Sequence, residues 1–174
     1  MKSIVFALLL VTIAQPAFAQ TIAPKTEVSG VSFLVGQWHS GSGKVADSGG
    51  TATGSSTVTW EANGSTLLRR DHANLFDASG KASGSFDQIM LIYPEGGTLH
   101  ADYFDGTHLT YYASAMVKPN RSVIFSTASR PGAPNFRLSY TLATPDTLAI
   151  AFSMAPPNSS QFHPIASGTL IKAN

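Results

Sequence analysis

The chain has 174 residues, with 11 Lys and Arg against 10 Asp and Glu, a formal net charge of +1 and no cysteine. Scattered basic residues in a near-neutral chain argue against a nucleic-acid-binding protein, which needs a concentrated basic surface, and against a polybasic membrane anchor. The lack of cysteine excludes disulfides and thiol chemistry, so the stability of the fold must come from its core.

The N-terminus has the pattern of a secretory signal peptide, which we assign to residues 1–19. Lys2 precedes an apolar stretch, 4–14, that is too short to remain as a membrane span. Residues 17–19 (AFA) fit the small-x-small rule for cleavage. Cleavage there leaves 174 − 19 = 155 residues, enough for one domain. We therefore expect a periplasmic or secreted protein with no integral membrane segment after cleavage.

Residues 20–29 are polar and contain a proline, so we expect a flexible N-terminal arm before a single domain, 30–174. Residues 30–34 fit one helical turn. Beyond them, β-branched and aromatic runs alternate with clusters of turn residues, which is typical of an all-β domain. The glycine- and serine-rich stretch 41–54 is either a flap over a barrel mouth or an inert loop. We predict strands over 35–43, 54–62, 66–76, 84–94, 97–104, 107–118, 121–129, 135–143, 147–155 and 162–172.

The order of these elements predicts a closed barrel. Asn63-Gly64 and Asp105-Gly106 supply the positive φ angles of tight hairpins, so consecutive strands pair as a meander. Such a sheet exposes long edges unless it closes on itself. We therefore predict a single antiparallel up-and-down β-barrel of about eight to ten strands, wide enough for a small ligand. An immunoglobulin-like sandwich is the alternative, although it usually needs longer crossovers. Trp38 and Trp60 are expected to fill the core.

Short motifs along the chain resemble those of a known superfamily. Residues 33–38 (FLVGQW) contain a Gly-x-Trp on the first strand after a helical turn, which resembles the opening motif of the calycins, the lipocalin-like and fatty-acid-binding-like barrels. Further motifs resemble uncharacterised secreted bacterial proteins with lipocalin-like domains: 59–61 (TWE), 70–73 (RDHA), 91–94 (LIYP), 103–105 (YFD) with His108, and 136–140 (FRLSY). The resemblance covers 33–172 and implies a barrel that binds a ligand. The first-strand motif of nitrobindin-type haem barrels is not reproduced at 41–45 (GSGKV).

Sequence patterns of catalysis or metal binding are absent. The chain has no Gly-x-Ser-x-Gly elbow and no complete phosphate-binding loop. Its five histidines form no His-x-His or His-Glu-x-x-His pair, so a metal site would need ligands from separate strands. We therefore assign no catalytic residue, no metal and no cofactor.

The strand pattern suggests which side chains line the barrel. Successive residues point to opposite faces, yet in 66–76 both faces mix polar and apolar residues: Arg70 and His72 alternate with Arg69 and Asp71. Because ligand pockets combine an apolar lining with a few convergent polar groups, we expect Arg70 and His72 inside; the alternative is that both are ordinary outward residues. The predicted ligand-binding residues are Arg70, His72, Gln88, Met90, Tyr103, His108, Tyr112, Met116, Tyr140 and Phe152.

The segment 103–112 (YFDGTHLTYY) predicts that three of these residues lie on one face. A turn at Asp105-Gly106 would set Tyr103 opposite His108, on the face that also carries Tyr112. The alternative is a solvent-facing Tyr–His pair that stiffens a hairpin and binds no ligand.

The sequence thus favours a binding protein for a small, partly apolar ligand held inside a β-barrel. Two alternatives stay open. One is a barrel enzyme in which His72 or His108 acts as acid or base beside Tyr103 or Tyr112. The other is a haem or porphyrin barrel with His108 or His163 as axial ligand.

Overall fold

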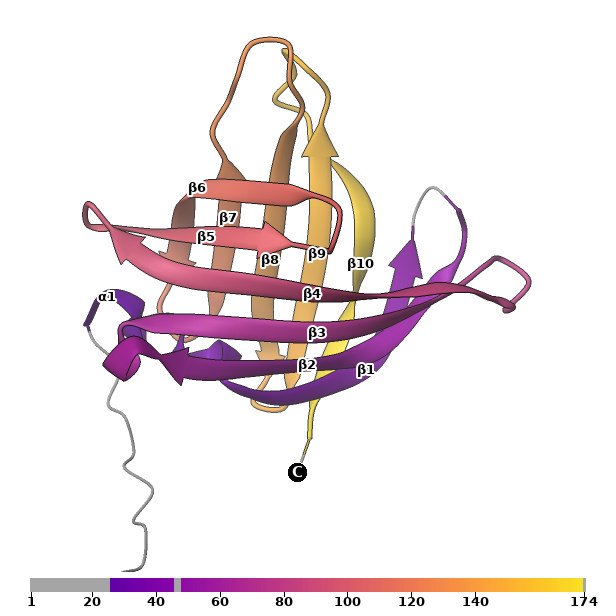
Figure 1. The fold of residues 1–174 in the computed structure, drawn as a ribbon, viewed down its shortest axis with the longest axis horizontal. Coiled ribbons are helices and arrows are strands. Elements are labelled where there is room, and N and C mark those ends of the chain that lie inside the picture. Colours follow the sequence, from indigo (N-terminus) through magenta and orange to yellow (C-terminus); the bar gives the residue numbers. More distant parts are fainter. Residues whose placement is uncertain (1–25, 46–47, 174) are drawn as a thin grey trace, which may run out of the picture.

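The computed structural model describes residues 26–45 and 48–173, and these form the predicted closed barrel. The predicted signal peptide and residues 20–25 of the expected arm lie outside the described residues. Each strand pairs antiparallel with its neighbours in the order β1-β10-β9-β8-β7-β6-β5-β4-β3-β2, which closes the ring and excludes the sandwich alternative. Figure 1 shows β2–β6 running across the direction of β7–β10, so the barrel is flattened into two crossed halves.

The strands lie close to the predicted ranges, and three short helical segments accompany them. The strands are β1 (Gly36–Val45), β2 (Thr51–Glu61), β3 (Thr66–Phe76), β4 (Ala82–Glu95), β5 (Thr98–Phe104), β6 (Leu109–Lys118), β7 (Ser122–Thr127), β8 (Asn135–Thr144), β9 (Thr147–Ala155) and β10 (His163–Lys172). The helical segments are α1 (Thr26–Ser29), η1 (Ser32–Leu34) and η2 (Ala62–Gly64). The glycine-rich stretch 41–54 is mostly strand, because β1 and β2 extend into it from both sides.

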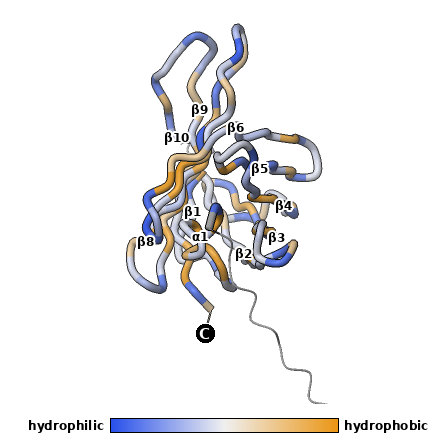
Figure 2. The backbone as a smooth tube through the Cα atoms, turned by 90° about the vertical axis from the view of Figure 1, so that its left-hand side faces the viewer, coloured by the Kyte–Doolittle hydropathy of each residue, from blue (hydrophilic) through white to orange (hydrophobic). Residues whose placement is uncertain are grey.

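The two ends of the barrel differ. The helix end holds α1, η1 and η2 together with the turns 96–97, 119–121 and 145–146. The loop end holds the segments 77–81, 105–108, 128–134 and 156–162; the last two project beyond the barrel at the top of Figure 1. Figure 2 shows that the apolar stretches follow the strands.

The helix end is plugged by side chains from the segment before β1. Within the expected flexible arm, residues 26–29 form α1 instead, and Val28 is fully buried. Leu34 at the end of η1 is buried beside Trp38, which is 2% exposed and donates its Nε1–H to the Leu34 carbonyl at 2.8 Å. The prediction that Trp38 fills the core is confirmed, while Trp60 is partly buried against the same core.

A β-bulge in β6 changes which residues face inward. Tyr112 pairs with Thr127, but Ser114 pairs with the next residue of β7, Ser126. Ala113 is therefore an extra residue without a partner, and the alternation of faces reverses after it. As a result, the inward residues beyond the bulge are Ala115 and Val117, which pack against the core.

Candidate functional site

The interior face of β3 carries the charged residues of the barrel core. Arg69 pairs with Val58 of β2 and Met90 of β4, both buried. Arg69 is buried too, and the side chain of Asp71, two residues further along the same face, is only 8% exposed. The site therefore uses Arg69 and Asp71, which the sequence pattern assigns to the opposite, outward face.

The predicted inward positions of Arg70 and His72 are wrong, because both side chains lie on the outer surface. His72 Nδ1–H there donates a hydrogen bond to Asp87 Oδ1 at 2.9 Å, and Nε2 lies 3.3 Å from Asn74 Oδ1. The bond to Asp87 raises the pKa of His72 above its ordinary value despite the opposing effect of desolvation.

Arg69 and Asp71 form a buried bidentate ion pair. The Nε of Arg69 donates to Asp71 Oδ1 at 2.9 Å, and Nη2 contacts Oδ2. Nη1 donates to the Tyr140 hydroxyl and lies 4.0 Å from the Met90 sulfur. Burial works against the charge of Arg69, but Tyr140 and Asp71 outweigh it, so the pKa of Arg69 lies above its ordinary value. The guanidinium is thus permanently charged, and its charge is cancelled inside the barrel.

Three tyrosines surround this pair from other strands. Tyr103 of β5 pairs with Met90, Tyr112 of β6 pairs with Ala101, and Tyr140 of β8 lies under the guanidinium, 5.3 Å from the Arg69 Cζ to the ring centroid. Burial raises the pKa of Tyr103 to about 12, and burial also raises the pKa of both Tyr112 and Tyr140. All three phenols therefore stay protonated at neutral pH and can donate hydrogen bonds.

Three more predicted site residues, Met90, Gln88 and Phe152, lie in or beside this cluster, whereas Met116 does not. Met90 and Tyr140 are buried, and Gln88 is partly buried opposite Asp71, on the same face. Phe152 of β9 is also partly buried; its ring stacks on Phe136 with centroids 5.6 Å apart and planes at 13°. The predicted inward position of Met116 is wrong: the bulge at Ala113 turns it outward, and it is 68% exposed.

The hairpin between β5 and β6 differs from the predicted two-residue turn. Phe104 pairs with Leu109 and Tyr103 with Thr110, so 105–108 forms a four-residue loop. Asp105 shapes it, because its Oδ1 accepts hydrogen bonds from the backbone N–H groups of Thr107 and His108 at 2.9 and 2.6 Å.

His108 consequently lies outside the barrel. Its side chain is exposed, 3.3 Å from the Asp105 carboxylate, and it is not opposite Tyr103 as predicted. His163, at the start of β10, is exposed at the loop end and pairs with Met154. Neither His72 nor His108 therefore lies beside Tyr103 or Tyr112, and the arrangement of the acid–base alternative is not formed.

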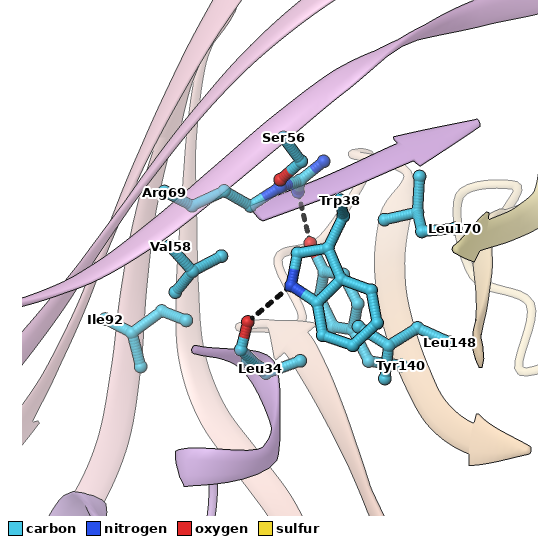
Figure 3. Close-up of a pocket in the computed structure, with 9 residues that line it drawn as sticks. All are labelled: Leu34, Trp38, Ser56, Val58, Arg69, Ile92, Tyr140, Leu148 and Leu170. Atoms are coloured by element: carbon cyan, nitrogen blue, oxygen red, sulfur yellow. Dashed lines mark hydrogen bonds between the residues drawn. The ribbon is translucent and has the colours of Figure 1, made fainter. Parts of the chain in front are cut away.

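Beneath the ion pair lies a small enclosed cavity, drawn in Figure 3. Its volume is about 10 Å³, close to the space of one water molecule. The Ser56 hydroxyl lines it, is buried, and has no hydrogen-bond partner within 26–45 and 48–173. Figure 3 shows Ser56 next to the Arg69 guanidinium, which donates a hydrogen bond to the Tyr140 hydroxyl. The helix-end half of the interior is thus filled.

A second depression lies at the helix end beside α1. It is an open groove of about 370 Å³. It is lined by Glu27, Ser29, Gly30, Gly97, Thr98, Leu99, Ala115, Val117 and Pro119. Glu27 is the only titratable residue among these, and no member of the Arg69 cluster reaches the groove. The groove has the size of a ligand site, and the polar side chains in its lining are Glu27, Ser29 and Thr98.

Two further properties of the described residues bear on function. They contain no group of three or more His, Asp or Glu side chains placed to hold a metal ion. None of their helices has the length and apolar character needed to cross a membrane.

Comparisons with known proteins support the architecture. No protein-family model matches the chain, and no curated protein matches it. The S-type phycobiliprotein lyase CPES from Guillardia theta has a similar structure, with a TM-score of 0.50 and 11% identity over 87% of this chain and 99% of that one. EF1p2_mFAP2b bound to DFHBI gives a TM-score of 0.45 at 13% identity over 85% of this chain and 100% of that one. A de novo designed fluorescence-activating β-barrel gives 0.45 at 9% identity over 86% and 100%. At these identities the likeness to the lyase concerns the fold alone.

Proposed function

We propose that this chain is an exported binding protein that holds a small, partly apolar molecule inside its barrel, at the loop end. The observation that carries the proposal is the buried pair of Arg69 and Asp71 within a largely apolar interior. Apolar residues of similar volume would stabilise the barrel as well or better. A charged pair retained at such a position therefore favours a role in forming a binding site over a role in stability.

The loop end is the favoured location because inward side chains keep some exposure there. The enclosed cavity near Trp38 has room for about one water molecule. Toward the loop end, by contrast, the inward residues Tyr103, Gln88, Phe136 and Phe152 are only partly buried. They combine aromatic walls with polar groups, which is the usual composition of a ligand site.

The resemblance to calycins and the signal-peptide pattern extend the proposal to a periplasmic or secreted carrier. Many calycin-type barrels hold their ligand inside, and the phycobiliprotein lyase has a similar fold. Sequencing the N-terminus of exported protein tests the secretion proposal: it should begin at Gln20, and a start at Met1 would contradict it.

The test of binding is native mass spectrometry of the protein purified from its own host, followed by solvent extraction. We expect a retained small molecule near one per chain. Phe152→Ala, which removes one of the two stacked rings, should reduce its retention at least severalfold. Tyr111→Ala is the matched control, because Tyr111 is 55% exposed on the outer surface of β6; it should retain the molecule.

The groove beside α1 is the alternative location of the ligand, and one variant in each place distinguishes the two. If Glu27→Lys abolishes retention while Phe152→Ala does not, the ligand lies in the groove and the proposed location is wrong. If the protein retains nothing from its host and binds no small apolar probe, the proposed function is wrong.

A further inference from the structure

The charged groups of the barrel interior are already engaged with one another, and this limits the class of ligand that the interior can bind. The Arg69 guanidinium is engaged by both carboxylate oxygens of Asp71 and by the Tyr140 hydroxyl. The carboxylate of Asp71 is engaged by the same guanidinium. The cluster therefore offers neither a free cation nor a free carboxylate, and its net charge is zero.

Two phenols of the interior remain: that of Tyr103, which is partly buried, and that of Tyr112, which is 2% exposed. Tyr103 and Tyr112 make no side-chain hydrogen bond within the part of the chain that the structure describes. Tyr103 pairs with Thr110 and Tyr112 with Ala101, so the two tyrosines are diagonal neighbours on one face, about 7–8 Å apart. Both phenols stay protonated because burial raises the pKa of each, so each can donate one hydrogen bond.

The opposite wall is apolar and aromatic. Phe136 and Phe152 stack on each other from β8 and β9, and both are partly buried. Such a pair of rings favours contact with the flat, apolar part of a ligand.

We propose that the ligand of this barrel is an uncharged molecule with a ring-sized apolar body and a hydrogen-bond acceptor, such as a carbonyl oxygen, received by Tyr103 and Tyr112. This inference rests on the proposed function. A carboxylate would lose its hydration without gaining an unpaired cation and would lie near the negative Asp71, so it is disfavoured. An apolar molecule without an acceptor would leave the two phenols unsatisfied.

The experiment compares three probes that share one bicyclic body: naphthalene, 2-acetylnaphthalene and 2-naphthoate, each measured by equilibrium dialysis. We expect 2-acetylnaphthalene to bind at least tenfold more tightly than 2-naphthoate and several-fold more tightly than naphthalene. Tyr103→Phe and Tyr112→Phe should each weaken binding of 2-acetylnaphthalene by about threefold to tenfold, the range for one neutral hydrogen bond. Neither variant should change the affinity for naphthalene.

Tyr111→Phe is the control on the neighbouring, outward position and should leave all three affinities unchanged. Thermal melting of each variant establishes that it is folded. If 2-naphthoate binds as tightly as 2-acetylnaphthalene, or if the preference survives both phenylalanine variants, the inference is wrong while the proposed function stands. If none of the three probes binds, the inference is wrong, and the proposed function is wrong as well only if the protein also retains nothing from its host.

Discussion

Asp71→Asn should destabilise the barrel strongly, because it removes one charge of a buried pair and leaves the other in place. The two side chains are 9% and 8% exposed, and no other carboxylate of the described residues contacts Arg69. Leaving such a charge uncompensated costs about 3–5 kcal/mol in the free energy of unfolding. For a domain of this size the melting temperature should then fall by about 6–20 °C. The double replacement Arg69→Met with Asp71→Leu removes both charges and should be neutral, or stabilising by about 1–4 kcal/mol.

Urea denaturation followed by circular dichroism measures these changes, provided that the m-value stays constant. Arg70→Met is the matched control, because Arg70 is the adjacent residue of the same type and is exposed; it should change the stability by no more than about 0.5 kcal/mol. A loss below about 1 kcal/mol for Asp71→Asn would refute the buried pair. The buried pair would also be refuted if the double variant were as unstable as Asp71→Asn.

Three further outcomes are expected. Trp38→Ala should cost about 3–5 kcal/mol by urea denaturation, since the buried ring plugs the helix end; a loss below about 1 kcal/mol would mean that the plug is dispensable. Tyr103 should ionise near pH 12 in a spectrophotometric titration, against an ordinary value of 10.0. Because its folded pKa is raised, its contribution to stability is complete below pH 10.0 and is lost as the pH rises through about 12; ionisation near 10 in folded protein would contradict this. By NMR, His72 should titrate above its ordinary pKa and return toward it in Asp87→Asn, and its stabilising contribution is lost as the pH rises through the raised value; an unchanged titration would exclude the Asp87 bond as the cause.

Most of the fold follows from local sequence signals. Glycine- and asparagine-containing turns separate the strands, and the strand ranges agree with the predictions to within a few residues. The left-handed backbone of Asn63 and Gly64, with φ of 54° and 77°, starts the β2–β3 pairing as their residue types predict. α1 was missed because four residues are too few for a helical period, and its buried Val28 depends on packing against the distant barrel.

The site was harder to predict because it depends on which face of β3 points inward. Leu68, Arg70 and His72 are about as polar as Leu67, Arg69 and Asp71, so hydropathy does not separate the two faces. Charge does offer a signal. An arginine and an aspartate two residues apart on one face can neutralise each other when buried, whereas Arg70 and His72 cannot. Applied to the sequence, this rule selects the face that the structure buries.

The errors at His108 and Met116 have another origin. Both depend on counting residues from a turn or along a strand, and each count is changed by an irregularity with no clear sequence pattern. The loop at 105–108 is longer than the Asp-Gly pair suggested, and Asp105 stabilises it through backbone contacts that any Asx turn could make.

The unpaired Ala113 divides β6 into two halves of opposite phase. Up to Tyr112 the strand belongs to the proposed ligand chamber, and from Ser114 onward it belongs to the packed base, with inside and outside exchanged between them. A mutant library that assigns the inward positions of β6 by strict alternation from Tyr112 would therefore target Met116, on the surface, in place of Ala115. Removing the single residue Ala113 would erase the irregularity without exchanging the faces: strict alternation would then hold along the whole strand, with Tyr112, Ala115 and Val117 inward and Met116 outward.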